Sequence, residues 1–109
     1  MFDTYELRMY ENPDSRVRSR VSALLEKENL VFEGEPEFTV CLEDEDGEIY
    51  ATASLAGKII KMVAVDASLQ EGGYSSKVIS AVISHARQKG KTSLFVFTKA
   101  GTAERFLSF

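Results

Sequence analysis

The chain has 109 residues, of which 44% are hydrophobic and 28% are charged, and its formal net charge at pH 7 is −4. This length and composition predict one globular domain covering residues 1–109 and exclude a disordered chain. The acidic charge disfavours nucleic acid as a partner, because binding to it depends on basic side chains that neutralise phosphates.

Three features of the sequence predict a cytoplasmic protein without a membrane partner. No apolar run approaches the roughly 20 residues of a membrane-spanning helix, and the acidic N-terminal segment MFDTYELRMY does not resemble a signal peptide. Cys41 is the single cysteine, so no internal disulfide can form, which fits a reducing compartment.

The first part of the chain predicts a strand followed by a helix. Polar and apolar residues alternate in TYELRMY, residues 4–10, as they do in a short strand. Asn12 is the expected N-cap of the helix and Pro13 its first residue, and Asn29 is its expected stop. One face of this helix is apolar, with Val17, Val21, Leu24 and Leu25.

Three strands follow, over residues 38–42, 49–55 and 59–65. Asp46-Gly47 predicts a hairpin turn between the first two, and Ala56-Gly57-Lys58 predicts a turn between the second and third. The third strand is almost wholly apolar, which predicts burial on both faces. The acidic segment EDEDGE, residues 43–48, is interpreted as a solvated turn because it lacks the spacing of a calcium loop. No metal site is predicted.

The last part of the chain predicts a helix, a strand and a second helix. An apolar stripe from Val78 to Ala86 has helical spacing and ends before Gly90. A strand is expected over residues 93–97 and a helix from Ala103 onward. The whole order predicts an α/β (α+β) fold, a mixed sheet with an antiparallel meander and a parallel β-α-β unit.

Two adjacent glycines, Gly72 and Gly73, precede the first of these two helices. The backbone N–H groups at a helix start have no partner within the helix and carry the positive end of its dipole. Glycines let a ligand approach such a backbone closely, so the segment is a candidate anion site. By themselves, however, the two glycines are better explained by a turn that needs positive φ.

The segment QEGGYS, residues 70–75, resembles the Q/R-x-x-G-x-G/A signature of the GNAT acetyltransferase superfamily, with Ser75 in place of the final small residue. The resemblance implies coenzyme A or acetyl-CoA as the ligand, its pyrophosphate on the glycine turn and its pantetheine arm along the preceding strand. The implied ligand-binding residues are Val63, Ala64, Val65, Gln70, Glu71, Gly72, Gly73, Tyr74, Ser75 and Lys99.

A more specific resemblance, to the N-terminal domain of the citrate (pro-3S)-lyase ligases, covers nearly the whole chain and is carried by residues 54–109. The motifs are LAG (55–57), KMVAVD (61–66) and LFVFTK (94–99). The resemblance implies an enzyme that uses ATP and acetate to acetylate the prosthetic-group thiol on the acyl-carrier subunit of citrate lyase. The ligand of this domain is then a dephospho-CoA-like arm, and the ATP site lies in a second domain that is absent here.

The same resemblance predicts a truncated fragment in which the closing C-terminal strands of the GNAT fold are missing. The strand at 93–97 would then have an unpaired edge, which predicts a homodimer through that edge.

No catalytic residue is assigned from the sequence. Residues 58–65 contain no acid, and Phe106 occupies the place on the last helix where GNAT enzymes often have a tyrosine. Lys77 is interpreted either as a phosphate ligand or as a solvated lysine, His85 as a surface or boundary residue, and Cys41 as a small buried hydrophobe. Two alternatives to the ligase domain stay open: a stand-alone GNAT N-acetyltransferase, and a structural module that has lost its ligand.

Overall fold

The computed structural model describes residues 5–69, 72–97 and 103–108, and the side chains through residue 96. Its elements, in chain order, are β1 (Glu6–Glu11), α1 (Ser15–Lys27), β2 (Phe38–Glu43), β3 (Ile49–Ala56), β4 (Ile59–Val65), a short 3-10 helix (Ala67–Leu69), α2 (Tyr74–Gln88), β5 (Ser93–Phe97) and β6 (Ala103–Ser108). Neither helix in this part of the chain is long and apolar enough to cross a membrane.

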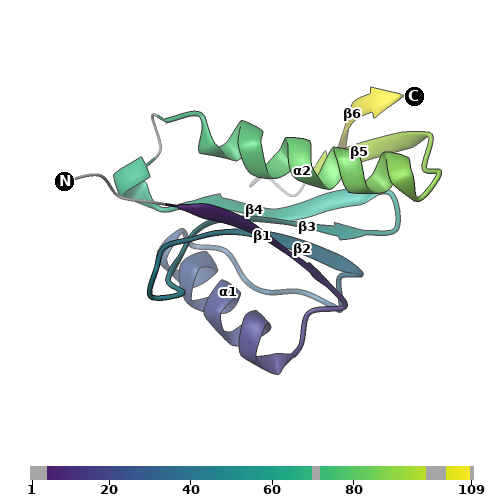
Figure 1. Ribbon diagram of the computed structural model, residues 1–109. Coiled ribbons are helices and arrows are strands. Elements are labelled where there is room, and N and C mark those ends of the chain that lie inside the picture. Colours follow the sequence, from purple (N-terminus) through teal and green to yellow (C-terminus); the bar gives the residue numbers. More distant parts are fainter. Residues whose placement is uncertain (1–4, 70–71, 98–102, 109) are drawn as a thin grey trace.

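The six strands form one sheet in the order β1-β2-β3-β4-β5-β6. All neighbouring pairs are antiparallel except β4 and β5, which are parallel and connected through α2. The predicted mixed sheet, with its antiparallel meander and parallel β-α-β unit, is therefore confirmed. Figure 1 shows the sheet between the two helices, with α2 on one face and α1 on the other.

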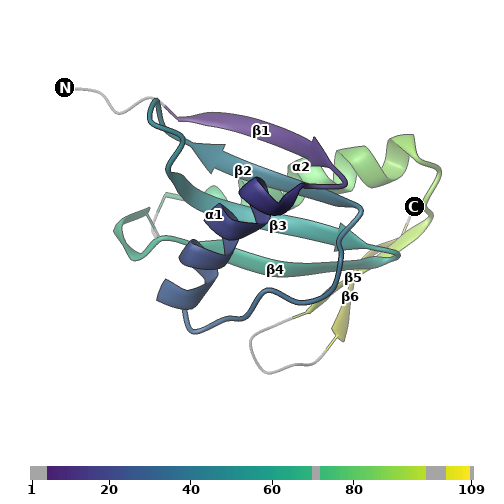
Figure 2. The same ribbon diagram turned by 90° about the horizontal axis from the view of Figure 1, so that it is seen from below.

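Each helix covers its own hydrophobic core. On the α2 side, apolar residues of β2, β3 and β4 meet the buried stripe of α2, which consists of Val78, Val82 and Ala86. On the α1 side, the predicted stripe of α1 packs against Cys41, Ile49, Met62 and Ala64. Figure 2 shows α1 lying across β3 and β4. Because both faces of the sheet are covered, its central strands are buried on both sides.

An irregularity in β4 changes which face its side chains reach. Ser54 of β3 is opposite Lys61 and Thr52 is opposite Ala64, so β4 has one extra residue between these pairs. Met62, with φ 55°, lies within this β-bulge. Ile60 therefore packs on the α2 side, whereas Met62 packs on the α1 side, although a regular strand would place both on one face.

The start of α1 differs from the prediction. The N-cap is Asp14, not Asn12, and its side chain accepts a hydrogen bond from the backbone N–H of Val17 at 3.0 Å. Asn12 instead has φ 48°, and its N–H donates to the carbonyl of Glu37 at 2.9 Å. Asn12 therefore extends the backbone hydrogen bonding between β1 and β2 by one bond. The helix begins two residues later than expected. The end is as predicted, with Asn29 at φ 61° just beyond α1.

The C-terminal helix predicted from Ala103 is wrong. Residues 103–108 form β6, which pairs antiparallel with β5 from Phe97↔Ala103 to Ser93↔Ser108. The helical preference of this seven-residue segment is weak, because so short a helix is hardly stable by itself. Pairing with the open side of β5 therefore outweighs it. Two expectations are corrected with it: β5 has a strand on each side and offers no free edge for a dimer, and Phe106 does not lie on a helix.

Candidate functional site

The glycine turn joins the C-terminal end of β4 to the N-terminus of α2. Asp66 follows β4 directly, the 3-10 helix spans Ala67–Leu69, and Gly73 is the N-cap of α2. The backbone N–H of Gly72 donates to the carbonyl of Leu69 at 3.2 Å. In a parallel β-α-β unit, this end of the strands is where ligands commonly bind.

Asp66 fixes the path of the chain into the turn. Its backbone N–H donates to the carbonyl of Tyr50 at 2.7 Å, which ties it to β3. Its carboxylate accepts from the N–H and the hydroxyl of Ser68, at 3.0 and 2.8 Å, and lies 3.5 Å from Nζ of Lys27. The Ser68 hydrogen bonds, helped by Lys27, lower the pKa of Asp66 below its usual value.

The two glycines are required for different physical reasons. Gly73 has φ 73°, a conformation that other residues rarely adopt, and a methyl group added there would meet no atom of the described residues within 4 Å. At Gly72 a methyl group would lie 2.7 Å from Cδ2 of Tyr74, too close to fit. Gly73 thus gives the turn its backbone shape and has open space in front of it, whereas Gly72 leaves room for an aromatic ring.

The N-terminus of α2 has backbone donors but no acidic neighbour in its first turn. The first intrahelical bond runs from the N–H of Lys77 to the carbonyl of Gly73 at 3.4 Å, which leaves the preceding N–H groups without intrahelical partners. Its N-cap, Gly73, makes no side-chain capping hydrogen bond, and no acid lies in the first turn of the described helix, whereas Asp14 caps α1. The positive end of the helix dipole is therefore available to an anion.

β4 extends past the pairs that the described residues make with β5. The two strands are paired at Ile59↔Phe95 and Ile60↔Val96, and residues Val63–Val65 lie beyond the last of these pairs. The bulge at Met62 comes at the same point. The C-terminal end of β4 is thus paired on the β3 side, follows the described β4–β5 pairs and leads into the segment before the glycine turn.

Most of the predicted ligand-binding residues can be located in this arrangement. Val63, Ala64 and Val65 end β4, and Gly72, Gly73, Tyr74 and Ser75 form the turn and the start of α2. Gln70, Glu71 and Lys99 lie outside the described residues. Nζ of Lys77 lies 5.2 Å from the centre of the Tyr74 ring, a contact that the sequence did not indicate.

His85 and Cys41 have structural surroundings. The His85 ring stacks on Phe38, with ring centres 3.7 Å apart, and its side chain is 13% exposed. It is thus a boundary residue, as predicted. Cys41 is fully buried, and burial raises the pKa of its thiol to about 12, so the thiolate that a nucleophile requires does not form near neutral pH. Its prediction as a small buried hydrophobe is confirmed.

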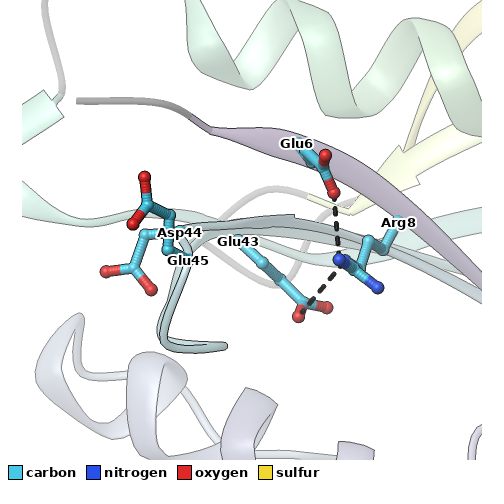
Figure 3. Close-up of a pocket in the computed structure, with 5 residues that line it drawn as sticks. All are labelled: Glu6, Arg8, Glu43, Asp44 and Glu45. Atoms are coloured by element: carbon cyan, nitrogen blue, oxygen red, sulfur yellow. Dashed lines mark hydrogen bonds and ion pairs between the residues drawn. The ribbon is translucent and has the colours of Figure 1, made fainter. Parts of the chain in front are cut away.

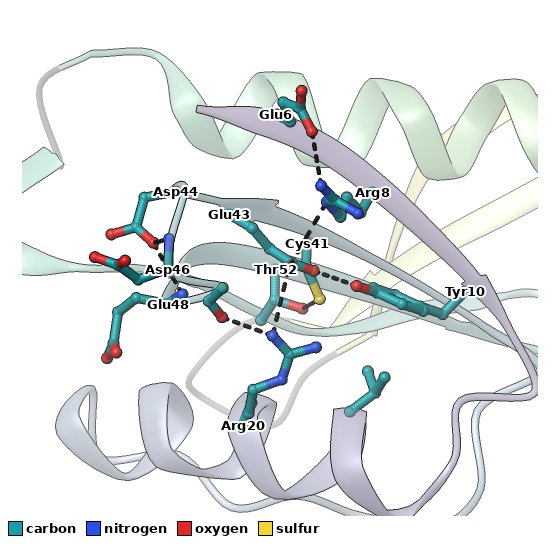
Figure 4. Close-up of polar contacts among 12 residues, drawn as sticks. Glu6, Arg8, Tyr10, Arg20, Cys41, Glu43, Asp44, Asp46, Glu48 and Thr52 are labelled. Carbon is teal, nitrogen blue, oxygen red and sulfur yellow. Dashed lines mark hydrogen bonds and ion pairs between the residues drawn. The ribbon is translucent and has the colours of Figure 1, made fainter. Parts of the chain in front are cut away.

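A second group of polar residues lies on the α1 side of the sheet, away from the glycine turn. Glu43, at the end of β2, is only 4% exposed and accepts a hydrogen bond from the hydroxyl of Tyr10. Its Oε1 lies 3.4 Å from Nη1 of Arg20 and 3.9 Å from Nε of Arg8. Nη1 of Arg20 also donates to the carbonyl of Gly47 at 2.6 Å (Figure 4). These contacts join β1, α1 and the β2–β3 turn.

A pocket of about 270 Å³ adjoins this group. Figure 3 shows the residues that line it, which are Glu6, Arg8, Glu43, Asp44 and Glu45. Within the described part of the chain, no group of three or more His, Cys, Asp and Glu side chains could hold a metal ion. The buried carboxylate is already paired with Tyr10, Arg8 and Arg20, so we interpret the cluster as structural.

The sequence pattern places Glu43 in the solvated segment EDEDGE, whereas the structure buries it at the end of β2. The remainder of that segment does form a turn, in which Asp44 accepts from the N–H groups of Asp46 and Glu48 at 2.9 and 3.0 Å. The alternation of Thr39, Cys41 and Glu43 along β2 is the signal that could have identified it, because residues two apart share one face of a strand.

Comparison with curated proteins gives two similar relatives, and no family model matches the chain. The citrate (pro-3S)-lyase ligase of Klebsiella pneumoniae is 29% identical over 93 residues, which is 85% of this chain. The enzyme of the same name from Haemophilus influenzae is 30% identical over 90 residues, or 83% of this chain. The chain spans only about a quarter, 27%, of the length of each relative. The resemblance to this family is thereby confirmed.

Comparison with solved structures gives the fold. A GNAT family N-acetyltransferase from Escherichia coli in complex with CoA matches 89% of this chain and 64% of its own, with a TM-score of 0.67 and 11% identity. N-acetylglutamate synthase from Neisseria gonorrhoeae, complexed with coenzyme A and L-arginine, matches 84% of this chain and 24% of its own, with a TM-score of 0.62 and 20% identity. The chain has the GNAT fold.

Proposed function

We propose that this GNAT-fold domain, similar to part of the citrate (pro-3S)-lyase ligases, is the N-terminal domain of such a ligase and binds a coenzyme A-like arm. The observation that carries the proposal is the glycine turn. Among the described residues, it combines a positive-φ Gly73, open space in front of that residue and N–H groups at the start of α2 that the N-cap glycine does not bond. Such a turn suits a pyrophosphate, which is an anion that accepts several hydrogen bonds.

The end of β4 supports the same ligand. Residues Val63–Val65 follow the described β4–β5 pairs and lead through Asp66 into the turn. A pantetheine arm contains amide groups, which can bond to strand backbone in the manner of an added strand. An arm along the end of β4 would therefore bring its pyrophosphate to Gly73. Backbone and small side chains would make these contacts, with Gln70, Glu71, Ser75 and Lys99 as further ligand residues.

The chemistry is assigned to another part of the ligase. General acid–base catalysis requires a titratable side chain within reach of the reacting atoms. The strand segment 58–65 has no acid, and the thiol of Cys41 is buried and protonated. In this proposal the domain presents the thiol of the prosthetic arm on the acyl-carrier subunit of citrate lyase, and a second domain uses ATP and acetate to acetylate it. We expect the reaction to occur in the cytoplasm.

A stand-alone N-acetyltransferase is the second candidate, because enzymes of that class have this fold. It would transfer the acetyl group from acetyl-CoA to an amine, with an ordered water as the base. Turnover of acetyl-CoA with a panel of amines tests it. Catalysed release of free coenzyme A, dependent on the amine, would favour this candidate over the ligase domain.

Calorimetry with coenzyme A and dephospho-coenzyme A tests the binding proposal directly. We expect both ligands to bind the wild-type chain. Gly73→Arg should abolish binding, since its side chain would enter the open space in front of the turn. Gly73→Ala is the matched control, because it introduces the same backbone strain at φ 73° without the bulk.

Two results would contradict the proposal. One is the absence of binding at millimolar ligand, which would favour a structural module that has lost its ligand. The other is equal affinity in wild type and Gly73→Arg, which would place the ligand elsewhere on the domain.

A further inference from the structure

The Tyr74 ring lies against the glycine turn instead of along the outside of α2. Tyr74 is the first residue of α2, and helical side chains point back toward the N-terminus of their helix. Its ring therefore reaches Gly72, where an added methyl group would lie 2.7 Å from Cδ2. The ring thus occupies the space that a side chain at position 72 would need.

Contacts from other parts of the fold hold this ring in place. Tyr5 packs edge-on against it with ring centres 6.2 Å apart, and Tyr5 packs in the same way on Tyr50 of β3 at 5.3 Å. The ring also packs against the hydrophobic core on the α2 side of the sheet. Nζ of Lys77 lies 5.2 Å from the ring centre, within the range of a cation–π contact. The ring thereby connects the turn to the sheet.

We infer that Tyr74 is a positioning residue, whose ring holds the glycine turn in its ligand-binding shape and is itself held by the Tyr5 ring. This inference rests on the proposed binding of a coenzyme A-like arm. The ligand contacts belong to backbone N–H groups around Gly73, and the ring acts through the turn. A preformed site binds more tightly because its ordering entropy is not lost on binding. Removal of the ring should therefore weaken every ligand whose pyrophosphate lies on the turn.

A different role for the ring would be direct stacking on the adenine of the ligand. The two roles differ in their effect on inorganic pyrophosphate, which has no ring to stack. A positioning ring affects the affinities for coenzyme A and for inorganic pyrophosphate by the same factor. A stacking ring affects the affinity for coenzyme A alone.

The binding experiment uses Tyr74→Ala, with Tyr74→Phe as the matched control. We expect Tyr74→Ala to weaken coenzyme A and inorganic pyrophosphate alike by about tenfold, and Tyr74→Phe to stay within about twofold of wild type. Tyr5→Ala removes the ring that packs on Tyr74 from just before β1; it should weaken both ligands by about threefold and add nothing to Tyr74→Ala. An unchanged affinity for either ligand in Tyr74→Ala would overturn the inference.

A second experiment needs no ligand, and so separates this inference from the proposed function. Gly72→Ala pushes the ring out of its place, so Gly72→Ala and Tyr74→Ala remove the same contact. Their effects on the midpoint of thermal unfolding should then be non-additive, with the double variant close to the more damaging single one. Additive shifts would overturn the inference, whereas a wild-type chain that fails to bind coenzyme A would overturn the proposed function.

Discussion

Replacement of Glu43 by glutamine tests whether the buried cluster on the α1 side stabilises the fold. Glutamine keeps the size of the side chain and an acceptor for the Tyr10 hydroxyl, but it removes the charge. Arg20 then loses its carboxylate partner, and Nε of Arg20 is already buried without a hydrogen-bond partner in the described part of the chain. The folded state should therefore lose more than one neutral hydrogen bond.

The exposure of the arginines sets the expected magnitude. Breaking a fully buried ion pair costs about 3–5 kcal/mol, and breaking an exposed one about 0.2–1 kcal/mol. Glu43 is 4% exposed, whereas the side chains of Arg20 and Arg8 are 33% and 57% exposed, so water partly compensates both guanidinium groups. We expect Glu43→Gln to lower the free energy of unfolding by about 2 kcal/mol, between these limits.

Urea unfolding followed by far-UV circular dichroism measures this loss, provided that the m-value is unchanged. Glu45→Gln is the matched control, because Glu45 is exposed in the adjacent turn and its replacement should change stability by less than about 0.5 kcal/mol. In the double variant Arg20→Met/Glu43→Gln, the losses should be less than additive. Equal stability of Glu43→Gln and wild type would refute the reasoning, as would fully additive losses in the double variant.

Three further predictions concern single residues. The folded-state pKa of Asp66 is lowered, so its contribution to stability is full above the ordinary carboxyl pKa of about 3.9 and is lost as the pH falls through the lower folded value. In urea titrations from pH 7 to pH 3, Asp66→Asn should show a smaller acid-induced loss of stability than wild type. An equal loss would count against this assignment. The Cys41 thiol, with its pKa raised to about 12, should resist a thiol reagent at pH 8 in the native chain and should react after unfolding in about 8 M urea. Rapid labelling of the native chain would show instead that the thiol is accessible. Leu25→Ala should lower the free energy of unfolding by about 3 kcal/mol, because Leu25 is fully buried. Val31→Ala, at a side chain 72% exposed, should have almost no effect on stability. Similar losses in both variants would contradict the described core.

Local patterns in the sequence determined the two helices and the first five strands. The apolar stripes of α1 and α2 and the strand at 59–65 are readable because a residue's spacing decides which face it occupies. The turns at Gly47 and Gly57 are readable as well, since both have positive φ, which glycine adopts without strain. The glycine turn before α2 belongs to the same class, and its resemblance to a known signature supplied the candidate ligand.

Only the tertiary structure decided the remaining features, because each depends on a partner distant in the chain. Residues 103–108 form a strand because they pair antiparallel with β5. Met62 turns to the α1 side because β4 has one more residue than the part of β3 opposite it. Glu43 can be buried because Tyr10, Arg8 and Arg20 meet its carboxylate from two other elements.

The two adjacent glycines show the same division within a single turn. The need for positive φ at Gly73 is a local property that sequence reasoning can anticipate. The need for glycine at position 72 arises from the Tyr74 ring, which Tyr5 and the core hold against the turn. Steric exclusion by a ring is a property of the packed molecule, so no local pattern could distinguish these two residues.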